Sequence, residues 1–72
     1  MKVKELTTIG KNIARIRKQK GLTQEDLCGM AQIDRSYLSE IENGKMNVTI
    51  KALVTIAAAL GCHLADLILE SR

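Results

Sequence analysis

Three polar side chains in one short stretch of the chain have the chemistry needed to contact the edges of DNA bases. Arg35, Ser36 and Ser39 are spaced so that a helix would present them on one face. An arginine can bind both acceptors of a guanine edge, and a serine hydroxyl can donate to or accept from a base. The pattern therefore predicts direct base readout, although a phosphate contact or a salt bridge to Glu40 or Glu42 would also explain Arg35.

Two short helices joined by a tight turn are predicted to carry these residues. Thr23 and Asp26 have the spacing of a capping box, in which each side chain binds the backbone amide of the other at the start of a helix. Asp34 is a suitable N-cap for the next helix, and the pair Asn43-Gly44 is typical of a helix end. Residues 23–43 therefore have the pattern of a helix-turn-helix.

This stretch resembles the helix-turn-helix of the Xre/Cro-type bacterial and phage repressors, in particular the small controller proteins of restriction-modification systems. The similarity extends from Ile9 to Leu69 and is carried by the segments Leu22-Thr-Gln-Glu-Asp-Leu, Asp34-Arg-Ser-Tyr-Leu-Ser-Glu-Ile-Glu-Asn-Gly-Lys, Thr49-Ile-Lys-Ala-Leu and Ile56-Ala-Ala-Ala-Leu-Gly. It implies an all-α fold, a compact five-helix lambda-repressor-like helix-turn-helix domain. It also implies a homodimer that binds a palindromic operator in double-stranded DNA and activates or represses promoters, with further dimers loading beside the first.

The other apolar residues recur at helical spacing, without the alternation that is typical of strands. We expect a first helix that ends near Gly21, a fourth that runs from Thr49 to Gly61, and a short fifth over about 63–70. The inward faces of the first four helices are expected to hold Leu6, Ile9, Ile13 and Ile16, then Leu27 and Met30, then Leu38 and Ile41, and finally Ile50, Leu53, Ile56, Ala57 and Leu60.

The length and composition fit one small domain over residues 1–72. We place the motif at residues 23–43 and a dimerisation region at about 49–70. Tyr37 is the single aromatic residue, so the core must be aliphatic. A core of this size often gains stability when the domain dimerises.

The net charge of +3 is unevenly distributed along the chain. The first 20 residues hold seven of the 11 Lys and Arg but one of the eight acidic residues, which leaves four basic and seven acidic residues in the remaining 52. A basic region of this kind suits a polyanion such as DNA, although a solvated helix face would also explain it.

A second group of polar residues is expected to hold the DNA backbone without reading its sequence. Gln24 lies at the start of the first motif helix, where the resemblance implies a phosphate contact that also supports the reading residue, and where the helix end attracts anions. Arg17 is the phosphate-binding candidate in the first helix, and Tyr37 would reach a phosphate with its hydroxyl. The other candidates are Thr23, for which capping is the alternative, and Asn43, Lys45, Asn47 and Thr49.

Two protein-binding surfaces are also expected. The resemblance implies that Glu25 contacts RNA polymerase in an activator, although a carboxylate at a helix start is also explained by the helix dipole. The fifth helix has more apolar surface than one small core can cover, so one side of it is expected to face a second subunit. The interface candidates are Leu64, Leu67, Ile68 and Leu69.

Several other classes of protein do not fit the sequence. No apolar run approaches the ~20 residues of a membrane span, and the N-terminus lacks the apolar core of a signal peptide, so we expect a cytoplasmic protein with no membrane partner. Cys28 and Cys62 are expected to be reduced core residues. We expect no metal, no cofactor and no enzymatic activity. The alternative function is a protein-interaction module, such as the antidote of a toxin–antidote pair.

Overall fold

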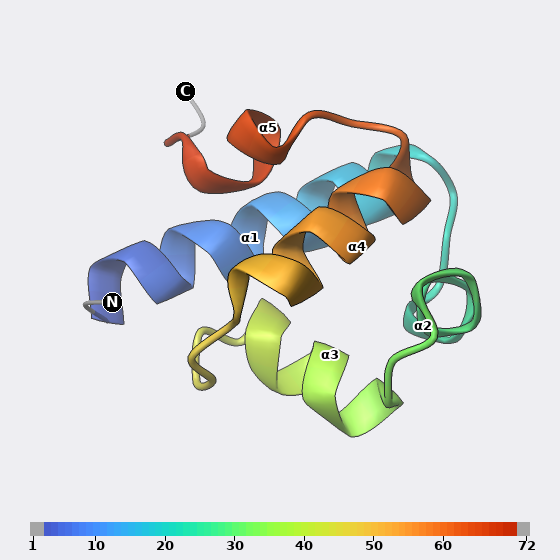
Figure 1. The fold of residues 1–72 in the computed structure, drawn as a ribbon, viewed down its shortest axis with the longest axis horizontal. Coiled ribbons are helices and arrows are strands. Elements are labelled where there is room, and N and C mark those ends of the chain that lie inside the picture. Colours follow the sequence, from blue (N-terminus) through green and yellow to red (C-terminus); the bar gives the residue numbers. More distant parts are fainter. Residues whose placement is uncertain (1–2, 71–72) are drawn as a thin grey trace.

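The computed structural model describes residues 3–70, which form five helices joined by short connections (Figure 1). This confirms the expected all-α, five-helix architecture. No helix among these residues is long and apolar enough to cross a membrane. The helices are α1 (Val3–Gln19), α2 (Gln24–Ala31), α3 (Arg35–Glu42), α4 (Ile50–Leu60) and α5 (Leu64–Ile68).

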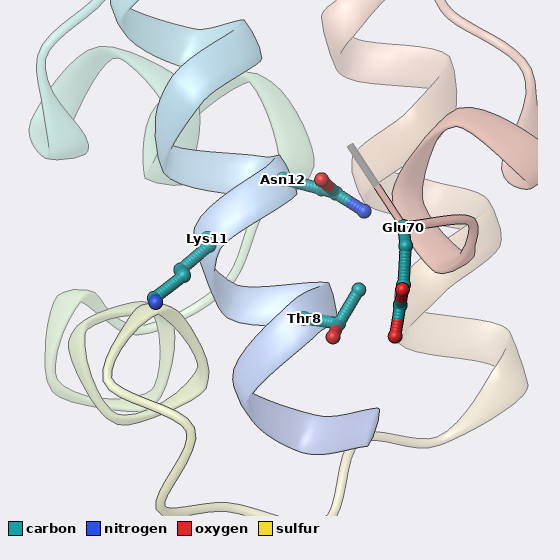
Figure 2. A pocket seen from close by; sticks show the side chains of 4 residues that line it. All are labelled: Thr8, Lys11, Asn12 and Glu70. Carbon is teal, nitrogen blue, oxygen red and sulfur yellow. The ribbon is translucent and has the colours of Figure 1, made fainter. Parts of the chain in front are cut away.

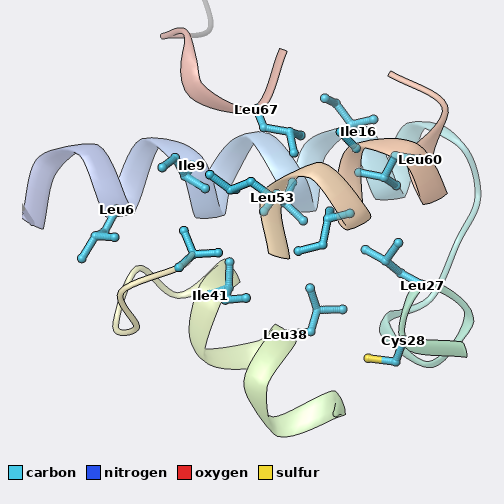
Figure 3. Close-up of a cluster of buried hydrophobic side chains, with 14 residues drawn as sticks. Leu6, Ile9, Ile16, Leu27, Cys28, Leu38, Ile41, Leu53, Leu60 and Leu67 are labelled. Carbon is cyan, nitrogen blue, oxygen red and sulfur yellow. The ribbon is translucent and has the colours of Figure 1, made fainter. Parts of the chain in front are cut away.

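The helices surround one aliphatic core. Helix α1 packs against α3 and α5, α2 packs against α3 and α4, and α4 also contacts α5. The core side chains come from all five helices (Figure 3). Those that are almost completely buried are Ile9, Ile13, Leu27, Leu38, Ile41, Leu53, Ile56, Leu60 and Leu67.

Side-chain hydrogen bonds cap the N-termini of α2 and α4, as the sequence predicted. The Thr23 hydroxyl accepts from the Asp26 amide at 3.0 Å, and the Asp26 carboxylate accepts from the Thr23 amide at 2.9 Å, which completes the capping box of α2. The hydrogen bond from the Thr23 amide lowers the pKa of Asp26. The ionised carboxylate therefore stabilises the fold at pH values above the usual carboxyl pKa, and this stabilisation is lost as the pH falls through the lowered pKa. Thr49 caps α4 by accepting from the Ala52 amide at 3.1 Å.

The turn between α2 and α3 depends on a residue in the left-handed backbone region. Gln32, at the C-cap of α2, has φ 55° and ψ 51°, and its amide donates to the carbonyl of Cys28. This conformation costs a non-glycine residue ~1–2 kcal/mol. It lets the chain change direction between the two helices within three residues, so that Asp34 can begin α3 as its N-cap. The side chain of Asp34 forms no capping hydrogen bond.

The structure corrects the expected inward faces at several positions. Ile50 is 65% exposed, and Met30 is also exposed, so neither belongs to the core. Helix α5 ends at Ile68, because Leu69 already has extended backbone angles. Both thiols are free: Cys28 is buried and Cys62 is half-buried, and burial raises the pKa of each.

Candidate nucleic-acid interface

The exposed side of α3 brings together the residues that the sequence assigned to base readout. Arg35 and Ser36 are exposed at the first turn of α3, and Ser39 is half-buried one turn later. These three residues line one shallow hollow together with Gln24 from the first turn of α2. Two helices therefore contribute to one polar surface, at which hydrogen-bond donors and acceptors are accessible.

Arg35 is free to contact a ligand. Its exposed guanidinium forms no ion pair with any residue that the structure describes, so the alternative of a salt bridge to Glu40 or Glu42 is not observed. The carboxylate of Glu42 is bound by another arginine. A planar guanidinium with unoccupied donors has the geometry that recognises a guanine edge or a phosphate.

A buried carboxylate beneath this surface connects three helices. Glu42, in the last turn of α3, accepts from Arg17 at both oxygens, with Nε–Oε2 at 2.8 Å and Nη2–Oε1 at 3.0 Å. Gln24 Nε2 also donates to Oε1, at 3.0 Å. The third guanidinium nitrogen of Arg17 donates to the carbonyl of Leu22 at 2.8 Å. This network fixes α2 and α3 relative to α1.

Burial makes this network a strong structural constraint. The side chains of Arg17 and Glu42 are 9% and 7% exposed, and the hydrogen bond to Glu42 raises the pKa of Arg17 above its usual value. Removing one partner of a buried ion pair typically costs ~3–5 kcal/mol, because the other charge is left without compensation. Gln24 lies at the edge of this network and also lines the hollow beside α3. Its hydrogen bond to Glu42 therefore connects the buried network to the exposed polar surface.

The structure corrects the expected role of Arg17. All three guanidinium nitrogens are used within the protein, and the residue is buried, so Arg17 positions Glu42 and does not present a free cation to a phosphate. The sequence showed a basic residue in a basic helix. It did not show the carboxylate 25 positions away that binds it.

The other backbone-contact candidates lie near the ends of α2 and α3. Thr23 is exposed, and its hydroxyl is the α2 cap. Asn43 closes the end of α3 by donating from Nδ2 to the carbonyl of Ser39 at 2.8 Å. Tyr37 packs partly against the core. The remaining candidates Lys45, Asn47 and Thr49 are exposed in the α3–α4 connection or at its end, where contacts with phosphates stay a prediction.

The candidates for the dimer interface divide into two groups. Leu67 is 0% exposed and belongs to the core, which contradicts its expected place at an interface, and Leu64 is half-buried against that core. Ile68 and Leu69 are exposed.

Sequence reasoning missed the exposed Ile50 and Val54 of α4, which lie one turn apart on a helix that packs against α5. The large apolar side chains exposed on α4, on α5 and just after α5 are therefore Ile50, Val54, Ile68 and Leu69.

Five helices, of which the second and third carry an accessible polar face across a tight turn, define a helix-turn-helix DNA-binding domain. Residues 13–67 match the helix-turn-helix family HTH_3, and this chain belongs to that family. It is a DNA-binding helix-turn-helix transcription regulator. Its family and relatives are regulators of this kind and not enzymes.

Several relatives are restriction-modification controllers. The chain is 42% identical over 59 residues to control protein C.MunI of Mycoplasma sp, which covers 81% of this chain and 80% of the relative. The controller protein C.AhdI from Aeromonas hydrophila has a TM-score of 0.86 and 33% identity, over 89% of this chain and 97% of that chain. The C.Esp1396I tetramer in complex with its natural 35 base-pair operator has a TM-score of 0.78 and 38% identity, over 90% and 95% of the two chains.

Proposed function

We propose that this protein is a restriction-modification controller that binds a palindromic operator as a homodimer. The observation that carries the proposal is the exposed face of α3, on a chain whose fold and sequence are similar to several such controllers over most of their length. The similar controllers come from bacteria, in which DNA lies in the cytoplasm, so the proposed place of action is the cytoplasm. A pairing of dimers along the DNA belongs to the same proposal, since the similar C.Esp1396I forms a tetramer on its operator.

Base readout is assigned to the N-terminal half of α3. In this class of domain the second motif helix enters the major groove with its first residues directed at the base edges. Arg35 would bind a guanine, and Ser36 and Ser39 would contact neighbouring bases or phosphates. Gln24, Thr23, Tyr37 and the connection after α3 would hold the DNA backbone on either side and set the register of the helix in the groove.

The test of this assignment is Arg35→Ala. We expect the mutation to weaken binding to the cognate operator by about 1–3 kcal/mol and binding to random DNA by much less, because a base contact contributes only at the correct sequence. Titration of cognate and scrambled duplexes at fixed salt concentration measures both. Gln24→Ala is the comparison variant, since a lost phosphate contact should weaken both duplexes to a similar extent. Equal losses for Arg35→Ala on the two duplexes would make Arg35 a phosphate contact.

The dimer interface is assigned to a surface formed by α4, α5 and the residue that follows. We define the apolar patch as Ile50, Val54, Ile68 and Leu69, which are exposed although they are large aliphatic residues. Burial of such side chains against a second copy removes apolar area from water and is the main driving force for association. A two-fold axis at this patch would place two α3 helices to read the two halves of a palindrome, about 34 Å apart.

Activation of transcription is proposed to use Glu25. This residue is exposed in the first turn of α2 and forms no ion pair with any residue that the structure describes, so its carboxylate is available to a basic surface of RNA polymerase. We expect Glu25→Ala to keep operator binding while it lowers activation in a reporter assay at matched operator occupancy. Unchanged activation under those conditions would leave Glu25 with its role in the helix dipole alone.

A further inference from the structure

A buried polar side chain connects α1 to the C-terminal end of α5. Asn12 is 1% exposed, and its Nδ2 donates to the carbonyl oxygens of Leu67 at 3.0 Å and of Leu69 at 2.7 Å. Figure 2 shows the Asn12 amide directed toward the segment that carries Glu70, across the pocket between α1 and this segment. One amide nitrogen therefore binds two carbonyls that are 55 and 57 positions away in the sequence.

The amide of Asn12 has one favourable orientation. Backbone carbonyls only accept hydrogen bonds, so they require the nitrogen of the amide. On the other side, Arg15 Nη2 donates to Asn12 Oδ1 at 3.3 Å, and a guanidinium cannot accept. A flipped amide would place oxygen against the two carbonyls and nitrogen against the guanidinium. Arg15 thus adds to the preference for the orientation that the two carbonyls require.

Helix α5 depends on such tertiary contacts for its position. It has five residues, Leu64–Ile68, and a helix of this length has little stability of its own. Leu67 anchors it in the core, but an apolar contact has no direction. The ion pair between Lys4 and Glu70, at 3.6 Å, is exposed on both sides and contributes little. The two hydrogen bonds from Asn12 are therefore the directional contacts of this segment with α1.

We propose that Asn12 is the positioning residue of the dimer interface. By binding the carbonyls of Leu67 and Leu69, its amide holds the end of α5 against α1, and with it the exposed side chains of Ile68 and Leu69 that the proposed dimer would bury. Without these bonds Leu67 would stay in the core, while Leu69 could move away from the apolar patch. The proposal rests on the dimer proposed above and adds a residue that lies outside the patch itself.

The test is the dissociation constant of the dimer without DNA, measured by sedimentation for Asn12→Ala and Arg15→Ala. For Asn12→Ala we expect a rise of about tenfold, because both hydrogen bonds to the α5 segment are lost in each protomer, and for Arg15→Ala a smaller rise of about two- to threefold. Ile41→Val controls for lost stability, because it loosens the core at α3, away from α5. Lys11→Ala controls for lost charge on the exposed side of α1.

The outcomes separate this proposal from the dimer proposal. An Asn12→Ala dimer as tight as the wild type, or an equal rise for Ile41→Val, would overturn the positioning role and leave the dimer in place. If Asn12→Ala does not fold, Arg15→Ala decides: equal values for Arg15→Ala and Lys11→Ala would overturn the proposal. A wild-type chain that stays monomeric at all concentrations would instead overturn the dimer, and the role of Asn12 with it.

Discussion

Replacing Gly10 by alanine is expected to remove most of the folding free energy of the protein at room temperature. A Cβ atom at this position would lie 2.3 Å from the carbonyl oxygen of Ile41 and 2.6 Å from that of Glu42. Both atoms belong to the backbone of α3, so the contact can be relieved only if α1 and α3 move apart. Overpacking of a core usually costs about 1–3 kcal/mol, and we expect the upper end of this range or more here. A domain of this size has ~3–5 kcal/mol available.

The matched control for this prediction is Gly29→Ala. Gly29 lies inside α2, and no atom would come within 4 Å of its Cβ. The same substitution there should be neutral or stabilising by up to about 1 kcal/mol, since alanine is the better helix former. Urea unfolding followed by far-ultraviolet circular dichroism compares the two variants. Equal stability of the two alanine variants would mean that the α1–α3 contact is not a constraint on the fold.

Replacing Leu69 by glutamate is expected to give a folded monomer with a dimer dissociation constant at least about 100-fold higher. Leu69 is 66% exposed in the single chain, so a carboxylate at this position stays hydrated and should not disturb the core. In the proposed dimer the same carboxylate would be buried without a partner in both subunits, which costs several kcal/mol. Binding to the palindromic operator should fall steeply, whereas binding to a half-site should change little.

Met30→Glu is the matched control for the interface. Met30 is also an exposed apolar residue, but it lies on α2, outside the apolar patch. Sedimentation at micromolar concentration should show a monomer for Leu69→Glu and the wild-type state for Met30→Glu. A Leu69→Glu protein that remains dimeric with normal operator affinity would place the interface elsewhere, and a monomeric Met30→Glu protein would place it on α2.

The local features of the chain could be predicted from the sequence. The caps at Thr23 and Thr49 and the helix ends at Gly21 and Gly61 depend on residues a few positions apart, and they lie where the pattern placed them. The polar face of Arg35, Ser36 and Ser39 follows from helical spacing in the same way. Short-range hydrogen bonds and backbone preferences suffice for such features, because they do not require knowledge of how the helices pack.

The residues at the ends of an apolar stripe could not be assigned to the core or to the surface from the sequence. Helical spacing places Ile50 with Leu53 and Ile56, and it places Leu64 with Leu67 and Ile68, but it does not show which members of a stripe the neighbouring helices cover. In the fold, Leu67 enters the core while Ile50 stays exposed. Leu67 was therefore expected at a surface although it is buried, and Ile50 was expected in the core although it is exposed, because the packing of the neighbouring helices decides what is covered.

The sequence by itself determined the all-α class, the position of the helix-turn-helix and the polar residues that share one face of α3. Only the tertiary structure showed that Arg17 binds Glu42, that Gly10 permits the contact of α1 with α3, and that Asn12 holds the end of α5. Each of these roles depends on a partner at least 25 positions away. A residue's type and its neighbours predict how the chain coils locally, whereas its distant partners are set by the packing of the complete domain.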